Sequence, residues 1–127
     1  MARPPSKELT ERELEIMHVC WRCGPATAAQ VRDQLAAAGR DLAYTTVATL
    51  IRILTEKGFL EQTNAERPFL YRPVRDFSDV SRSLVGDLVD RVFHGSREQL
   101  LVRLLEQRKL TAKERAVLEA ILRKEKP

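Results

Sequence analysis

Residues 45–52, TTVATLIR, combine small hydroxyl and methyl side chains with a single arginine. Wound as a helix at about 100° per residue, the segment from 45 to 57 separates into two faces. The apolar face has the spacing of a helix packed on a core and holds Val47, Leu50, Ile51 and Leu54. The opposite face holds Thr45, Ala48, Thr49 and Arg52, with Thr46 at its edge. No acidic residue occurs between positions 42 and 55, so nothing in this segment repels phosphate.

Side chains of these types suit a helix that enters the major groove of DNA, which is about 12 Å wide. Threonine hydroxyls donate to phosphates or base edges, and threonine and alanine methyls contact the thymine methyl. One arginine can reach guanine or a phosphate. The alternative is an exposed helix face that is rich in threonine for no functional reason. The elements predicted around this helix are therefore needed to decide between a DNA-reading helix and a face without function.

Four capping boxes mark helix starts, each with Ser or Thr followed three residues later by Glu or Gln. They begin at Thr10, Thr27, Ser96 and Thr111. The breaks at Gly24-Pro25, Gly39 and Gly58 mark the ends of the first three helices. The sequence thus predicts helices over about 11–21, 28–38 and 45–57.

Two segments of alternating character follow, at 59–63 and 69–72, and residues 64–68 between them indicate a hairpin tip. Pro68 beside the second segment is tolerated only at a sheet edge. Three helices and then a two-stranded ribbon is the order of a winged helix-turn-helix, whose third helix is the recognition helix and whose ribbon is the wing. Arg67 at the tip would reach a phosphate or the minor groove, or it is a solvated turn residue.

The chain changes character at residues 73–76, which predicts a DNA-binding domain over 1–75 and a helical dimerisation domain over 76–127. Helices are expected over about 77–94, 97–108 and 112–125, giving a mainly α fold. The first of these helices is apolar over half its circumference or more, against a stripe of about 100° for a helix packed on one core. About fifty residues cannot bury that surface alone, so we expect a second copy of the chain to cover it. The expected dimer residues are Val80, Leu84, Leu88, Val92, Leu100, Leu101, Leu104 and Leu105.

The length and net charge of the chain add little evidence on its function. The 127 residues carry a formal charge of +4, shared equally by the two predicted domains, which favours an anionic partner only weakly. No apolar run approaches the roughly 18 residues of a membrane span, and the N-terminus lacks the apolar core of a signal peptide. We therefore expect a cytoplasmic protein that does not insert into the membrane.

Cys20 and Cys23 form the motif CWRC at the end of a predicted helix. The helix dipole opposes a thiolate there, and His18 and Cys20 fall on opposite sides of the helix. We expect two small apolar side chains and neither a redox site, a metal nor a cofactor. The sequence also has no Gly-rich phosphate loop and only two histidines, 76 positions apart, so no enzyme is expected.

Four segments, LTERELEIMHVCW, GPATAAQVRDQL, AYTTVATLIRILTEKGFL and LYRPV, resemble the penicillinase-repressor family, which includes the methicillin-resistance regulators. The resemblance continues through SRSLVGDLVDRVFHGSREQLLVRLLEQRKLT and so runs from Leu9 to about Leu122. It implies a winged-helix repressor of antibiotic-resistance genes that binds double-stranded inverted-repeat operators as a homodimer. The C-terminal helices would form the dimer.

The family resemblance also implies a route of induction. Members are often inactivated by proteolysis in the C-terminal domain, set off by a membrane-bound sensor metalloprotease, and the best-known members are cut at an Asn-Phe bond. The matching positions here hold Arg103 and Leu104, so this bond differs. A copper-sensing branch has a Cys-rich C-terminus, whereas the tail AILRKEKP has no cysteine. The alternative to a repressor is a winged-helix module that contacts only other proteins.

Overall fold

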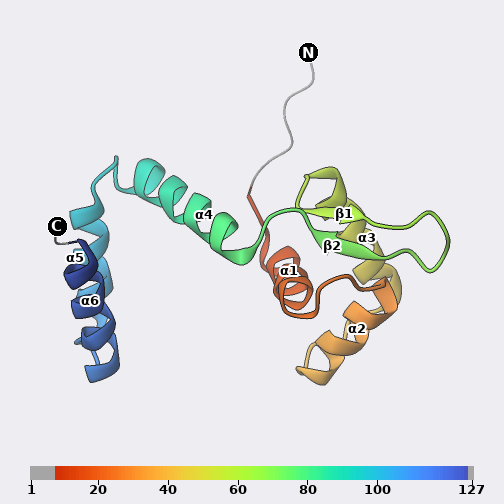
Figure 1. Ribbon diagram of the computed structural model, residues 1–127, viewed down its shortest axis with the longest axis horizontal. Coiled ribbons are helices and arrows are strands. Elements are labelled where there is room, and N and C mark those ends of the chain that lie inside the picture. Colours follow the sequence, from red (N-terminus) through yellow and green to blue (C-terminus); the bar gives the residue numbers. More distant parts are fainter. Residues whose placement is uncertain (1–7, 126–127) are drawn as a thin grey trace, which may run out of the picture. The chain divides into compact units, whose positions relative to one another are not determined.

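The computed structural model describes residues 8–125, which form six helices and one two-stranded sheet (Figure 1). The first elements are α1 (Glu11–Cys23), α2 (Ala28–Ala37), α3 (Tyr44–Glu56), β1 (Leu60–Gln62) and β2 (Tyr71–Pro73). They are followed by α4 (Phe77–Val92), α5 (Arg97–Gln107) and α6 (Ala112–Glu125). This order confirms the predicted fold class, a winged helix-turn-helix followed by three helices.

Local hydrogen bonds begin the helices where the capping boxes predict. At α1 the Thr10 hydroxyl accepts from the Glu13 N–H at 3.2 Å, and the Glu13 carboxylate accepts from the Thr10 N–H at 2.9 Å. The same reciprocal pair forms at α2 between Thr27 and Gln30. Helix α3 differs, because Ala43 at its N-cap offers no side-chain oxygen. The start of α3 therefore depends on packing rather than on a cap.

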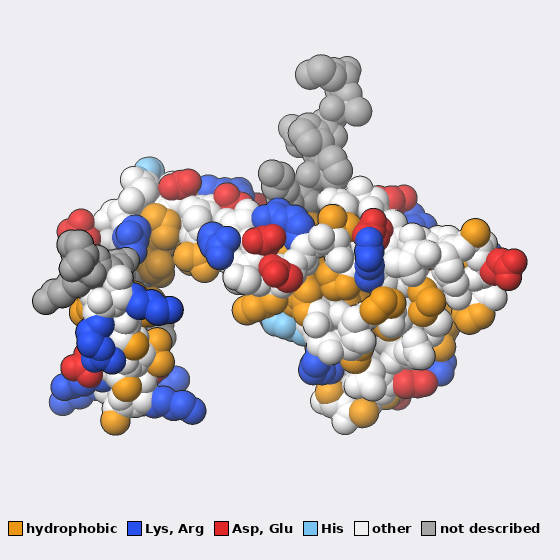
Figure 2. Space-filling view, viewed as in Figure 1, with side chains coloured by type: hydrophobic (Ala, Val, Ile, Leu, Met, Phe, Trp, Pro, Cys, Tyr) orange, Lys and Arg blue, Asp and Glu red, His pale blue; other side chains and the backbone are white. Residues whose placement is uncertain are grey.

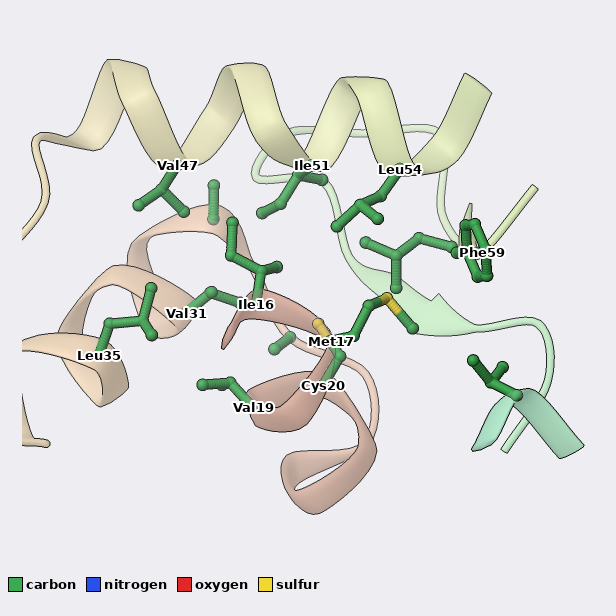
Figure 3. Packing of buried hydrophobic residues seen from close by; sticks show 14 residues of the cluster. Ile16, Met17, Val19, Cys20, Val31, Leu35, Val47, Ile51, Leu54 and Phe59 are labelled. Atoms are coloured by element: carbon green, nitrogen blue, oxygen red, sulfur yellow. The ribbon is translucent and has the colours of Figure 1, made fainter. Parts of the chain in front are cut away.

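One apolar core joins α1, α2, α3 and β1 (Figure 3). In Figure 3, Val47, Ile51 and Leu54 point from α3 toward Ile16 and Met17 of α1. All five side chains are buried, and full burial of such a side chain contributes about 1.5–3 kcal/mol. The apolar face predicted for α3 is thus the buried face, which turns the threonine-rich face outward.

A largely buried ion pair between Lys57 and Glu13 joins the end of α3 to the start of α1. Lys57, the C-cap of α3, donates from Nζ to Glu13 Oε1 at 2.9 Å and Oε2 at 3.2 Å, and to the Glu8 carbonyl at 3.0 Å. The Glu13 side chain is only 4% exposed. Burial raises the pKa of Glu13, but the hydrogen bonds from Thr10 and Lys57 and the Lys57 charge outweigh it, so the pKa lies below its ordinary value. This pair ties the end of α3 to the start of α1.

The wing is an antiparallel pair in which Glu61 lies opposite Arg72 and Gln62 opposite Tyr71. Tyr71 also bridges to Ala26 on its other side, through backbone hydrogen bonds of 2.9 and 3.0 Å, so the wing is anchored to the turn before α2. β2 begins two residues later than predicted. The Leu70 N–H donates to the Asn64 side chain rather than to the neighbouring strand.

The chain divides into two compact units between Leu84 and Val85, within α4. The first turns of α4 belong to the first unit because Val80 is only 2% exposed and packs in its core. Trp21 strengthens this connection by donating from Nε1 to the Arg75 carbonyl at 3.0 Å. The division of function at residues 75 and 76 stays a prediction. No helix among residues 8–125 combines the length and apolar character needed to cross a membrane.

Candidate nucleic-acid interface

An open groove of about 720 Å³ lies between the outward face of α3 and the wing, with the first turn of α2 at its side. Four of the six residues predicted to contact DNA line it: Ala48, Thr49, Arg52 and Arg67. They come from two elements separated in the sequence, since Arg67 lies on the loop between β1 and β2. The fold therefore gathers the predicted helix face and the predicted wing residue on one concave surface.

The other two predicted residues lie at the start of α3 and are not among the groove-lining side chains. Thr45 is exposed on the first turn, and Thr46 is half-buried beside it. The helical period places Thr45 opposite the buried Val47, one turn before Thr49, and places Thr46 at the edge of that face. Any contact from these two threonines would be made beside the groove.

The arginine on the outward face of α3 has a partner that its sequence segment did not predict. Arg52 Nη1 lies 3.3 Å from Glu56 Oε2, one turn along α3, and the two side chains are 63% and 64% exposed. Both side chains line the groove. Glu56 directly follows the acid-free segment, which ends at Thr55. Its i, i+4 spacing from Arg52 is the sequence signal that could have revealed the pair. The carboxylate orients the guanidinium in the free protein and faces any DNA phosphate with a like charge.

Aromatic rings form another part of the groove wall that the sequence did not reveal. Tyr44, Phe69 and Tyr71 line it. The Arg32 guanidinium carbon lies 5.9 Å from the centre of the Tyr44 ring, and that of Arg67 lies 5.3 Å from the Phe69 ring. These distances are typical of cation–π contacts. Arg67 thus lines the groove against an aromatic ring, and Arg32, which is not a lining residue, lies against the ring of Tyr44.

The first turn of α2 completes the wall through Thr27, Ala28 and Ala29. The start of a helix presents N–H groups that have no partner within the helix, together with the positive end of the helix dipole. Both features favour an anion at that place, and a DNA strand in the groove would bring phosphates there. Ala28 itself is buried, and the Gln30 N–H is already bonded to the Thr27 hydroxyl at 3.1 Å.

A different surface belongs to the second unit, where large apolar side chains are exposed among charged ones (Figure 2). Within the predicted dimer set, Leu100 is half-buried. Val80 packs inside the first unit and Leu84 packs against that core, so both are occupied within the chain. The exposed members of the set are Leu88, Val92, Leu101, Leu104 and Leu105. Further exposed apolar residues on the second unit are Val85, Val102, Val117, Leu118, Ile121 and Leu122.

The bond between Arg103 and Leu104 lies inside α5. Arg103 donates to Glu106 Oε2 at 2.8 Å, and Leu104 is 60% exposed. A helical backbone does not fit a protease cleft, which takes an extended strand, so this turn of α5 has to open before the bond can be cut.

The two cysteines have different surroundings. Cys20 is buried in the core, which raises the pKa of its thiol to about 12, with a further contribution from the nearby Cys23. Cys23 is exposed, and neither cysteine is in a disulfide. Within residues 8–125 no cluster of three or more His, Cys, Asp or Glu side chains is arranged to hold a metal ion. Cys20 is therefore a protonated core side chain at neutral pH.

Comparison with solved structures finds the same fold in other proteins. The DNA-binding domain of the repressor BlaI, known from a solution structure, has a TM-score of 0.51 and 29% sequence identity, covering 62% of this chain and 93% of that chain. MarR from E. coli, in its oxidised form, has a TM-score of 0.50 at 20% identity, covering 92% of this chain and 75% of that chain. The likeness to MarR concerns the fold alone.

Sequence comparison finds relatives along most of the chain. The transcriptional regulator BlaI of Mycobacterium tuberculosis is 36% identical over 101 residues, which are 78% of this chain and 72% of the relative. The methicillin resistance regulatory protein MecI of Mammaliicoccus sciuri is 26% identical over 117 residues, 92% of this chain and 94% of the relative. Residues 9–124 match the family described as penicillinase repressor. The chain belongs to the penicillinase repressor family.

Proposed function

We propose that this protein is a sequence-specific DNA-binding repressor of transcription that acts as a homodimer on an inverted-repeat operator. The observation that carries the proposal is the groove between α3 and the wing, which gathers Ala48, Thr49, Arg52 and Arg67 on one concave surface. Relatives described as a transcriptional regulator, a methicillin resistance regulatory protein and a penicillinase repressor support a role in the regulation of transcription. The resemblance extends to regulators of antibiotic resistance, and the genes controlled would belong to that class.

In this proposal the α3 face supplies the sequence specificity. Arg52 reaches a base edge, most simply the two acceptors of a guanine, while the methyls of Ala48 and Thr49 contact thymine. Thr45 and Thr46, at the start of α3, contact the phosphate backbone beside the groove. Arg67 on the wing contacts a phosphate outside the bases that α3 reads. Phosphate contacts fix the position of the helix, and base contacts select the site.

Two copies are needed because one winged helix gives a small interface. A single module typically buries about 600–1,000 Å² of protein surface on DNA. Joining two modules makes the second half-site contact effectively intramolecular, which can raise affinity by about 10²–10⁴-fold. The exposed leucines of α4 and α5 are the surface we assign to this dimer. Burying them also removes apolar area from water.

Release from DNA would then follow from loss of the dimer. Cleavage of the Arg103–Leu104 bond after local opening of α5 would divide the exposed leucines and leave the groove intact. A membrane-bound sensor metalloprotease is the proposed origin of that signal. The protein itself would work in the cytoplasm without a cofactor and without inserting into the membrane.

Selection from a random pool of DNA duplexes tests the proposal without knowledge of the operator. The full-length protein is incubated with the pool, and bound duplexes are recovered, amplified and sequenced over several rounds. We expect enrichment of one motif repeated in inverted orientation. Failure to enrich any sequence, with the protein folded, would favour the alternative of a winged-helix module that binds only proteins.

A further inference from the structure

The side chain of Asn64 makes three of the hydrogen bonds within the loop between β1 and β2, and Gln62 Nε2 donates a further one to the Asn64 carbonyl at 2.7 Å. Asn64 Oδ1 accepts a hydrogen bond from the Leu70 N–H at 2.8 Å. Its Nδ2 donates to the Glu66 carbonyl at 2.9 Å and to the Pro68 carbonyl at 3.1 Å. Both amide protons and the carbonyl oxygen are therefore engaged, all of them with backbone of the same loop.

These bonds replace backbone pairing that the loop lacks. The last backbone hydrogen bond at the neck of the loop runs from the Thr63 N–H to the Leu70 carbonyl at 2.8 Å. Beyond it, residues 65–69 have no backbone-to-backbone hydrogen bond within the part of the chain that the structure describes. An exposed tip of this kind is ordinarily mobile. Asn64 supplies three side-chain hydrogen bonds across this tip.

The position of the two donor bonds points to Arg67. The carbonyls that Asn64 holds belong to Glu66 and Pro68, the residues directly before and after Arg67. Arg67, Pro68 and Phe69 all line the groove beside α3, and the Arg67 guanidinium lies against the Phe69 ring. The backbone on both sides of Arg67 is thus fixed while its charge remains exposed at the groove.

We propose that Asn64 is a positioning residue for DNA binding, which fixes the wing tip so that the Arg67 guanidinium meets a DNA phosphate without first ordering the loop. The inference rests on the proposed function. A loop that is already ordered does not lose conformational entropy when it binds, and this preserves affinity. Because the contact is to phosphate, Asn64 would affect affinity for all sequences equally.

The test compares Asn64→Ala, Arg67→Ala and the double variant in the full chain. The probes are a duplex selected from a random pool by the wild-type protein and a scrambled duplex of the same length. Arg67→Ala should weaken binding to both duplexes by about tenfold and reduce the salt slope by about one for each bound protomer. Asn64→Ala should weaken both by a similar or smaller factor. Added to Arg67→Ala, it should cause little further loss, because the residue that it positions is gone.

Two controls separate positioning from general damage to the fold. Thr63→Val removes only a 3.4 Å side-chain bond to the Leu70 carbonyl at the same loop and should leave binding unchanged. Asn64→Asp keeps an acceptor for the Leu70 N–H but turns a carboxylate oxygen toward the Glu66 and Pro68 carbonyls, which it repels, so it should bind at least as weakly as Asn64→Ala. Thermal unfolding should shift by only a few degrees in each variant, since the tip is outside the core.

The inference is overturned if Asn64→Ala weakens binding by the same factor with and without Arg67, or if it leaves binding unchanged while Arg67→Ala weakens it. A wild-type protein that enriches no duplex from the pool would instead contradict the proposed function. The two failures are therefore distinguishable.

Discussion

Arg52 and Glu56 form an ion pair of 3.3 Å across one turn of α3, with both side chains exposed on the groove wall. DNA in the groove would bring phosphates toward the carboxylate and would compete for the guanidinium. We expect Glu56→Gln to strengthen binding to every duplex by about 0.5–1 kcal/mol, the scale of an exposed ion pair. Glu106→Gln is the matched control, because it removes an acid paired with Arg103 on α5. Titration of each variant with labelled duplex measures the effect, and weaker binding by Glu56→Gln would contradict it.

The helix starts could be predicted from sequence because a capping box is a local signal. Thr10 with Glu13, and Thr111 with Glu114, make their predicted hydrogen bonds within three residues of chain. The second strand was predicted two residues too early because its start depends on Asn64, which takes the Leu70 N–H away from the sheet. Competition between a side chain and a strand for one N–H cannot be read from alternation of residue types.

The site was predictable only in part, because some of its residues are brought together by elements that are far apart in the sequence. The period of α3 identified Ala48, Thr49 and Arg52, because one helix determines which residues share a face. Tyr44 lines the same groove from the first position of the helix. Tyr44 belongs to the groove wall because α2 and the wing lie beside it in space. The sequence pattern of α3 does not show where those two elements lie. The fold brings them together through packing of α3 on α1 and through the bridge between Ala26 and Tyr71.

Acid should destabilise the first unit through Glu13. The pKa of this carboxyl lies below its ordinary value, so its contribution is present at neutral pH and is lost as the pH falls through the folded-state pKa. Glu13→Gln should reduce the free energy of unfolding by about 2–3 kcal/mol at neutral pH and flatten the loss below about pH 5. Urea unfolding at intervals between pH 3 and 7 measures both effects.

Glu114→Gln provides the comparison for that experiment. Glu114 forms the same capping box with Thr111 but is exposed and has no lysine partner in the described structure. Its substitution should cost less than about 1 kcal/mol. If Glu13→Gln retains the pH dependence of the wild type, the buried pair does not control acid stability.

Dimer formation should depend on the exposed leucines of α5. Leu101→Asp or Leu105→Asp places a charge within the proposed interface, and each should yield monomers at micromolar concentration. A chain ending at Leu84 should also be monomeric and bind one half-site weakly, with its core intact because Val80 is retained. Sedimentation with and without the selected duplex measures both states. Gln107→Asp adds the same charge to α5 without removing an apolar side chain and should remain dimeric.

One result would contradict the proposed dimer. A wild-type protein that remains monomeric at micromolar concentration, yet binds a duplex with two half-sites tightly, would show that the apolar surface of the second unit has another role.

Repeating the duplex selection with Arg52→Ala tests most directly whether the outward face of α3 reads DNA. We expect the variant to enrich the same inverted repeat as the wild type, with preference relaxed at one position in each half-site and affinity lower by about 1–3 kcal/mol. An equal loss on every sequence, with a salt slope smaller by about one, would assign Arg52 to a phosphate instead. An unchanged motif bound with unchanged affinity would contradict the account, because it would mean that this face does not meet DNA.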